Sequence, residues 1–398
     1  MEILANGSVT SPRGFSAGAT YCGLKTGGLD LCIVYSEHPC TAAGVFTRNR
    51  VQAAPIAVCR EHLRRGRVQG FVANSGNANA CTGEPGVANA REMAALAAAR
   101  VGLEQDQMLV ASTGVIGVPL DMDKVRRGLQ SIQLSPEGGH EAARAIITTD
   151  TTTKEIAVSL DMEGCTITIG GMCKGSGMIH PNMGTMLAFL TTDAAAEPAF
   201  LQEALHQAVD ATFNMVTVDG DTSTNDTAVV LANGAAANPV LSADSPSARA
   251  FQEALTSVCQ YLAIAIARDG EGASKLLTVT VRGAESLSDA RLAARTVAGS
   301  SLFKAAVYGA DPNWGRILAA AGRSGAMVDQ TKADIWIGDV ALMQGGRILP
   351  FDRQQAAANM KGAEVNVLVD LHLGTAEATA WGCDLTERYV EINAEYTT

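Results

Sequence analysis

A glycine followed by a threonine, Gly184-Thr185, ends a glycine-rich loop at 174–184 and precedes an apolar run at 186–190. Glycine has no side chain and adopts backbone angles that other residues avoid, so a neighbouring hydroxyl can approach its carbonyl carbon. Attack by the Thr185 hydroxyl would convert the Gly184 amide into an ester, and hydrolysis would free the α-amino group of Thr185. Spacing alone favours an ordinary turn before a strand, so cleavage between these two residues is a hypothesis.

A threonine with a free α-amino group is a nucleophile that carries its own base. An α-amino group has a pKa of roughly 7.7 to 8.0 and can accept the hydroxyl proton near neutral pH. Acyl transfer also needs hydrogen-bond donors for the developing oxyanion. The segment 111–114 follows the apolar 108–110 and offers the Thr113 hydroxyl and the Gly114 amide, although a plain turn at a strand end fits it too.

Other polar segments fit known sites less well. The run 219–226 places oxygen side chains at alternate positions, but Val230 stands where a calcium loop needs Glu, so we expect a buried polar turn and no metal site. The segment 171–176 lacks the spacing of a phosphate-binding loop. His180 has no spaced triad partners, and Cys173 beside Lys174 is a candidate nucleophile that more often would be an inert core thiol.

Composition excludes several partners and locations. The formal net charge of −11 is opposite to what phosphate backbones attract, so we expect no nucleic acid partner. The 9 cysteines form no C-x-x-C pair, which argues against zinc and for reduced thiols. Neither a basic-then-apolar leader nor 18 uninterrupted apolar residues occurs, so we predict a cytoplasmic protein away from membranes.

The elements that must position these residues follow from apolar periodicity. Helical spacing occurs around 93–101 and 251–262, and the second helix is expected to use Ser245 as cap, Pro246 in its first turn and Gly270 after its end. Runs typical of strands lie near 30–35, 155–161, 166–170, 186–191, 276–282, 334–343 and 364–373.

Two of these strands are separated only by Glu163-Gly164, which predicts a hairpin and therefore antiparallel pairing. Hairpins together with long helices indicate a layered α/β protein with mixed sheets. At 398 residues, the chain is long enough for two domains or for one domain built in halves.

The sequence resembles the ornithine acetyltransferase family of arginine biosynthesis, also described as bifunctional glutamate N-acetyltransferases. The resemblance covers nearly the whole chain, through blocks at 10–15, 41–47, 74–80, 148–151, 174–187, 218–223, 269–273, 311–316 and 391–394. It implies an αββα layered fold. It also implies a precursor that cleaves itself into an α chain, 1–184, and a β chain, 185–398, which assemble as α2β2.

The resemblance also implies roles for individual residues. Thr185 would be the nucleophile, and Thr113 with Gly114 would form the oxyanion hole. Substrate contacts would come from Thr151, Lys174, Thr185, Glu271, Asn393 and Thr398. Of these, Lys174 suits a carboxylate and Glu271 an ammonium.

The implied reaction moves acetyl from N-acetylornithine to glutamate through acetyl-Thr185 and releases ornithine. No metal or other cofactor is implied, while acetyl-CoA as a second donor stays open. Two alternatives remain: a self-cleaving amidohydrolase or aminopeptidase of related fold, and a non-catalytic paralogue that binds an amino acid.

Two positions depart from the family pattern. The family usually has Ala before the nucleophile, where this chain has Gly184, and usually ends in Tyr-Arg-Thr, where this chain has Tyr396-Thr397-Thr398. A glycine still satisfies the steric need for a small residue. The missing arginine removes a fixed charge with five donors, which could alter carboxylate recognition.

Overall fold

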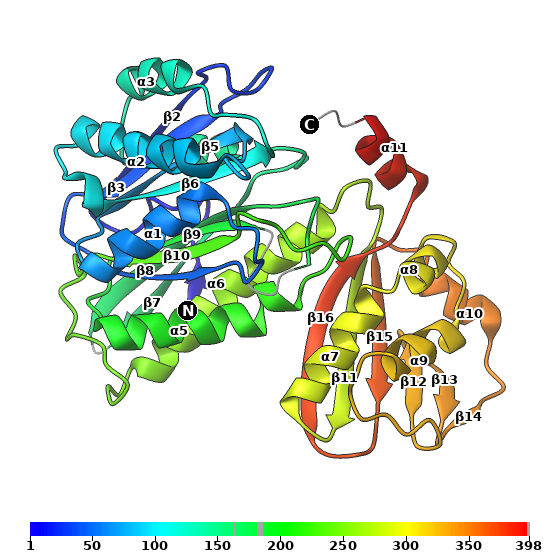
Figure 1. Cartoon of the computed structure of the whole chain (residues 1–398). Coiled ribbons are helices and arrows are strands. Elements are labelled where there is room, and N and C mark those ends of the chain that lie inside the picture. The colour runs from blue at the N-terminus through cyan, green and yellow to red at the C-terminus, as the bar shows by residue number, and fades with distance from the viewer. Residues whose placement is uncertain (163, 181–185, 396–398) are drawn as a thin grey trace.

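The computed structural model describes residues 1–162, 164–180 and 186–395, and Figure 1 shows them arranged as two adjoining bodies. The larger body contains two sheets. The six-stranded sheet has the order β1 (Glu2–Ile3), β7 (Lys154–Met162), β8 (Cys165–Lys174), β9 (Leu187–Thr192), β10 (Thr227–Ala232) and β4 (Thr41–Phe46). The four-stranded sheet has the order β2 (Phe15–Thr20), β3 (Leu31–Ser36), β5 (Gly70–Asn77) and β6 (Met108–Val115).

The two sheets pack face to face. Phe71 on β5 and Phe189 on β9 stack with ring centroids 4.1 Å apart, in a core that joins residues of both sheets. On the outer side, the four-stranded sheet is contacted by α1 (Ala54–Arg65), α2 (Gly83–Arg100) and α3 (Met122–Ser131). The six-stranded sheet is contacted by α5 (Pro198–Ala211) and α6 (Ala248–Arg268). These layers confirm the expected αββα sandwich (Figure 1).

The smaller body is built on a third sheet. Its order is β14 (Arg347–Ile348), β13 (Val340–Gln344), β12 (Asp334–Ile337), β15 (Glu364–Asp370), β11 (Leu276–Ala284) and β16 (Ala376–Cys383). α7 (Leu287–Ala298) packs on β11 and β16, and α6 of the larger body contacts the same two strands.

The remaining helical elements are distributed over both bodies. They are η1 (Gln105–Gln107), α4 (Gly139–Ile146), η2 (Phe213–Met215), α8 (Ser301–Tyr308), α9 (Trp314–Gly322), α10 (Arg353–Ala358) and α11 (Glu387–Glu395).

Strand pairing agrees with the mixed sheets expected from the sequence. β7 and β8 pair antiparallel, with Met162 opposite Cys165, which confirms the hairpin, whereas β9–β10 and β11–β15 are parallel. The single strand expected at 334–343 is wrong. Gly338 has a φ of +59°, a conformation that favours glycine, and it turns this segment into the antiparallel pair β12–β13.

The start expected for the long second helix is also wrong. α6 begins at Ala248, and the hydroxyl of Ser245 accepts a hydrogen bond from the backbone N–H of Ser242 at 2.9 Å instead of capping the helix. Among the described residues, α6 is the one helix long and apolar enough to span a membrane. Its apolar side is buried against α5, β7 and β8, as expected for a core helix.

Candidate active site

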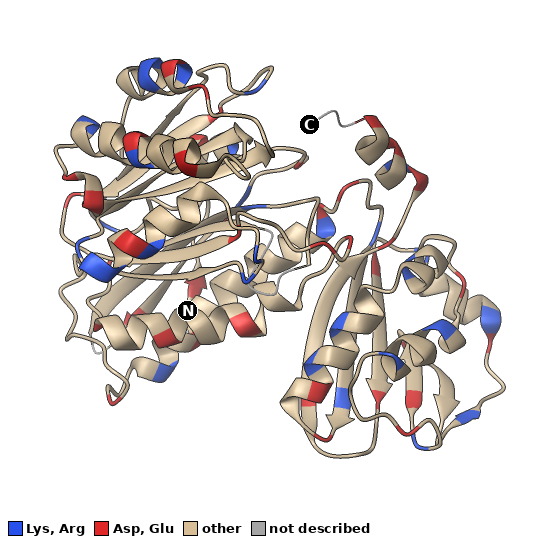
Figure 2. Cartoon of the chain, viewed as in Figure 1, with Lys and Arg blue, Asp and Glu red and all other residues tan. Residues whose placement is uncertain are grey.

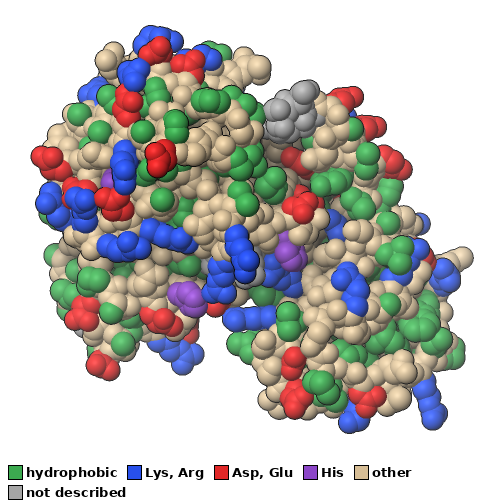
Figure 3. Space-filling model, viewed as in Figure 1, with side chains coloured by type: hydrophobic (Ala, Val, Ile, Leu, Met, Phe, Trp, Pro, Cys, Tyr) green, Lys and Arg blue, Asp and Glu red, His purple; other side chains and the backbone are tan. Residues whose placement is uncertain are grey.

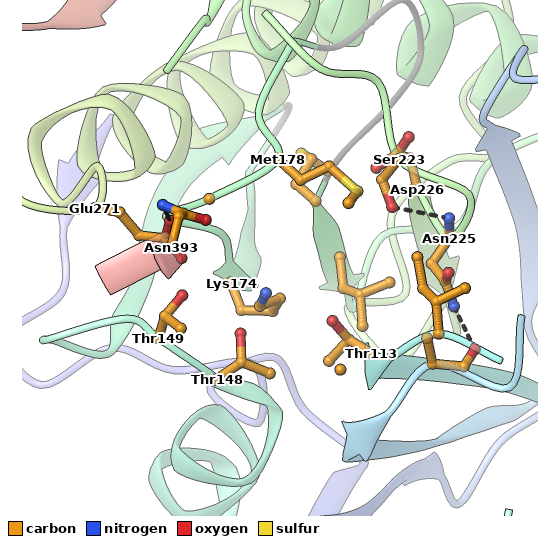
Figure 4. A pocket seen from close by; sticks show the side chains of 16 residues that line it. Thr113, Thr148, Thr149, Lys174, Met178, Ser223, Asn225, Asp226, Glu271 and Asn393 are labelled. Carbon is orange, nitrogen blue, oxygen red and sulfur yellow. Dashed lines mark hydrogen bonds between the residues drawn. The ribbon is translucent and has the colours of Figure 1, made fainter. Parts of the chain in front are cut away.

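A cavity of about 340 Å³ opens where the ends of β6 and β8 meet the loop before β10 and the loop after α6, and Figure 4 shows its labelled side chains. Thr113 and Asn225 lie on one side, Glu271 and Asn393 on the opposite side, and Lys174 between them (Figure 4). Five residues predicted from the sequence therefore line a single cavity: Thr113, Gly114, Lys174, Glu271 and Asn393.

The predicted oxyanion donors stand at an irregular strand end. β5 and β6 change register around Gly76 and Thr113, as in a β-bulge, which commonly redirects side chains beside active sites. Gly114 has a φ of +131°, and a Cβ there would lie 2.4 Å from the backbone of Gly76, so no other residue fits. Asn225 holds this end by donating to the Ser112 carbonyl at 2.8 Å.

Lys174 enters the cavity from a buried cluster of charges. The carboxylate of Asp150 lies 2.6 Å from the Lys154 ammonium and 3.9 Å from that of Lys174. Asp269 lies 2.5 Å from Lys154, so two carboxylates face two ammonium groups. Burial by itself would raise the pKa of Asp150, but Lys174 and Lys154 lower it to about 2. Lys174 is thereby fixed with its ammonium at the cavity wall.

Burial lowers the pKa of Lys174, and attraction to Asp150 offsets only part of that shift. The side chain is 10% exposed, so water screens its charge weakly. An anionic group of a substrate that enters the cavity would therefore meet a poorly hydrated cation, which favours a charge-assisted hydrogen bond.

Glu271 and Asn393 form the opposite wall. The Asn393 side-chain amide donates to Glu271 Oε2 at 2.9 Å, and Asn393 lies on α11, 122 residues further along the chain. Gly177 makes this arrangement possible, because a Cβ at that position would lie 2.3 Å from the Glu271 carboxyl group. The pair presents a carboxylate and an amide, which suit an ammonium group.

Thr151 does not line the cavity. Its backbone N–H and its hydroxyl both donate to Asp269, which forms an ion pair with Lys154. Thr151 therefore contacts the charge cluster that holds Lys174 and not the cavity itself. Thr148 and Thr149 line the cavity from the same segment. Gly184, Thr185 and Thr398 lie outside the described residues. The description resumes at Met186, which lines the cavity.

Asp226 is a cavity residue that sequence reasoning missed as an individual site. It is 2% exposed, and neither carboxyl oxygen has a hydrogen-bond partner among the described residues. The Thr47 hydroxyl and the Met186 amide lie close to it, but neither makes a hydrogen bond of ordinary geometry with it. Burial raises the pKa of Asp226 well above its usual value, and these neighbours and Lys174 offset only part of the rise.

Replacing Asp226 by Asn should stabilise the fold at neutral pH. A raised pKa means that the folded state favours the protonated acid, so stability is lost as pH rises from about 4 through the folded-state pKa. The amide cannot ionise, so the melting temperature of Asp226→Asn relative to the parent should increase between pH 4.5 and 8. Thermal unfolding across this range measures it, with exposed Asp244→Asn as control. A relative melting temperature that falls as pH rises would contradict the assignment.

The calcium-like run acts as a polar turn, as expected. Asp219 accepts hydrogen bonds from the backbone N–H groups of Met178 at 2.6 Å and Ile179 at 2.9 Å. It thus holds the loop after Lys174 against the cavity. Cys173 is fully buried, and burial raises its pKa, which agrees with an inert core thiol rather than a nucleophile.

Comparison with known proteins identifies relatives along the whole chain. The ArgJ family model matches residues 16–398. The "Arginine biosynthesis bifunctional protein ArgJ" of Symbiobacterium thermophilum is 55% identical, with 100% of both chains covered. The protein of the same name from Bacillus subtilis is 44% identical, covering 100% of this chain and 98% of its own.

Two solved structures of related proteins each match about half of this chain. A crystal structure of the Bacillus halodurans arginine biosynthesis bifunctional protein is 46% identical and has a TM-score of 0.51, covering 52% of this chain and 97% of its own. An ornithine acetyltransferase from Mycobacterium tuberculosis is 39% identical, with a TM-score of 0.42, over 46% of this chain and 98% of its own. The chain therefore belongs to the ArgJ family, and it is an acetyl-transferring enzyme of arginine biosynthesis.

Proposed function

We propose that the enzyme transfers acetyl from N-acetylornithine to glutamate through an ester on Thr185. The observation that carries the proposal is the single cavity that joins oxyanion donors, a buried cation and a carboxylate, and that is also lined by Met186. Because Met186 directly follows Thr185 in the chain, a nucleophile at the start of a cleaved β chain would be delivered next to these groups.

The first half-reaction follows from these groups. The Thr185 hydroxyl oxygen bonds to the acetyl carbonyl carbon while its proton passes to the freed α-amino group of the same residue. The Thr113 hydroxyl and Gly114 N–H stabilise the tetrahedral oxyanion. The carbon–nitrogen bond then breaks, the α-amino group returns the proton to the departing nitrogen, and ornithine leaves an acetyl ester on Thr185. In the second half, the glutamate amine attacks this ester and regenerates the hydroxyl.

Substrate recognition divides between the two cavity walls. Lys174 would bind a substrate carboxylate, and Glu271 with Asn393 would bind the ammonium group that ornithine carries and glutamate lacks. Thr398 completes this proposed set from the C-terminus, and Thr151 supports it through Asp269.

Self-cleavage into 1–184 and 185–398 is part of the same proposal. The solved Bacillus halodurans chain supports it, because 52% of this chain covers 97% of that polypeptide, as a half-length fragment would require. The α2β2 assembly, the cytoplasmic location and a reaction without metal or cofactor are also proposed, on the family resemblance. Acetyl-CoA is the candidate second donor.

Product formation should depend on the acceptor. With N-acetylornithine as donor, we expect steady ornithine release only when glutamate is added, and parallel lines in double-reciprocal plots, because the ester forms before glutamate binds. Quantifying ornithine and N-acetylglutamate by mass spectrometry tests this. Steady release of ornithine and acetate without glutamate would instead identify a hydrolase. Substituting acetyl-CoA for N-acetylornithine in the same assay decides whether a second donor is used.

A further inference from the structure

A second cavity, of about 360 Å³, lies between the end of α5, η2 and α7. It is on the other side of the loop that follows Lys174, because Gly177 and Met178 line the active-site cavity whereas His180 lines this one. Other lining residues with polar side chains are Asp210, Asn214, Ser288, Arg291, Arg295 and Thr296. The elements that form this cavity come from both bodies of the fold.

Arg295 is the unusual group in this cavity. Its Nε and Nη2 atoms are buried and have no hydrogen-bond partner among the described residues. Burial lowers the pKa of Arg295 to about 10. A guanidinium offers five donors and stays charged, so leaving it buried and unpaired is costly. An anion in this cavity would satisfy these buried donors.

A second guanidinium strengthens this conclusion. Arg291 lies one helical turn before Arg295 on α7, and like charges at this spacing repel unless an anion lies between them. Asp210 is the one carboxylate among the described lining residues, and it already accepts a hydrogen bond from Asn214 at 2.7 Å. Its other oxygen lies 3.8 Å from His206.

His180 adds a neutral polar group. Its Nδ1 lies 3.0 Å from the Thr217 hydroxyl, and burial together with Arg295 lowers its pKa to about 4. At neutral pH the imidazole therefore adds no charge.

The surface charge is uneven near this cavity. The chain carries a net charge of −11, and acidic side chains are spread over both bodies (Figure 2). Figure 3 nevertheless shows basic side chains and a histidine gathered where the two bodies meet.

We propose that this cavity binds a phosphate-type oxyanion between Arg291 and Arg295. Two guanidinium groups match a dianion, and their planar donors suit bidentate contacts to phosphate oxygens. The hydroxyls of Ser288 and Thr296 can donate to the remaining oxygens. Two sources share this chemistry: free inorganic phosphate, or a phosphate group of coenzyme A bound near the acetyl-transfer cavity.

Calorimetric titration of the purified enzyme with inorganic phosphate, at constant ionic strength set by chloride, tests the site. Binding should weaken at least tenfold in both Arg295→Gln and Arg291→Gln and stay unchanged in Arg249→Gln, a control whose side chain is 90% exposed on α6. No measurable phosphate binding by the parent enzyme, or equal binding by all four proteins, would overturn the proposal.

A stability measurement guards against misfolded variants. In phosphate-free buffer Arg295→Met should melt no lower than the parent, because it removes an unpaired buried charge while keeping an apolar stem. Added phosphate should raise the melting temperature of the parent but not that of Arg295→Met. An equal phosphate-induced shift in both proteins would show that the anion binds elsewhere.

The source of the oxyanion is decided by a third arm. Coenzyme A and pantetheine, which lacks the phosphates, are titrated into the parent and Arg295→Gln. Coenzyme A binding at least tenfold tighter than phosphate, lost in the variant and absent for pantetheine, assigns the site to coenzyme A. Coenzyme A binding no tighter than phosphate, but still dependent on Arg295, assigns it to free phosphate.

Discussion

The Thr185→Ala variant should remain a single chain of 398 residues and should transfer no acetyl group. The substitution removes the hydroxyl that attacks the Gly184 carbonyl, so no ester forms and no α-amino group is freed. The cavity walls themselves do not depend on cleavage for their residues, so the variant should still fold. Intact mass and a denaturing gel report cleavage, and ornithine release in the presence of glutamate reports transfer.

Thr185→Ser is the matched control, because it keeps the hydroxyl and loses only a methyl group. It should be cut more slowly and should retain measurable transfer. In the cleaved parent, amino-terminal sequencing of the second fragment should read Thr185-Met186-Leu187-Ala188. A Thr185→Ala protein that is cut normally would remove this residue from the mechanism, and an uncut but active parent would separate transfer from cleavage.

The local parts of this enzyme could be predicted from the sequence. The hairpin between β7 and β8 depends on two turn residues, and the helical spacing in α6 spans a few turns, so neither needs distant contacts. Errors arose where one residue decides a boundary, as Gly338 does between β12 and β13. The order of layers came from the family resemblance, because alternation identifies a strand but not the sheet that it packs against.

The site was less predictable from the residues themselves, because its walls join distant segments. Lys154 and Asp269 are 115 residues apart, and Glu271 and Asn393 are 122 residues apart. Asp226 belongs to a polar run that the sequence predicts to be a turn. Its burial without a hydrogen-bond partner depends on strands that are distant from this run in the sequence. The spacing of residues in the sequence does not predict which carboxylate of such a run is buried away from water.

The Arg291–Arg295 pair illustrates the same limit. On sequence alone, two arginines one turn apart on a helix indicate a solvated face. Only the fold brings α7, η2 and the end of α5 around one cavity, where two nitrogen atoms of Arg295 are buried without a hydrogen-bond partner among the described residues. The sequence positions of these two arginines therefore do not indicate an anion site, whereas the burial of Arg295 in the structure does.

The Thr113→Ala variant should lower the turnover number by about one to three orders of magnitude, with a smaller change in the Michaelis constants. An oxyanion donor acts mainly on charge that develops in the transition state, and removing one such donor typically costs about a hundred- to a thousandfold in rate. The second donor, the Gly114 amide, belongs to a backbone fixed against Gly76, so it should remain in place and leave residual activity.

Steady-state kinetics with N-acetylornithine and glutamate varied in turn separate this role from a structural one. Thr113→Ser retains a hydroxyl at the same strand end and should recover most of the lost turnover, whereas a fold that merely needs the threonine methyl group would treat both variants alike. Thr113 also lines the cavity wall, so a binding role would raise the Michaelis constants and leave turnover intact. Because both half-reactions pass through an oxyanion at the same place, the loss in Thr113→Ala should appear in ornithine release and in N-acetylglutamate formation alike.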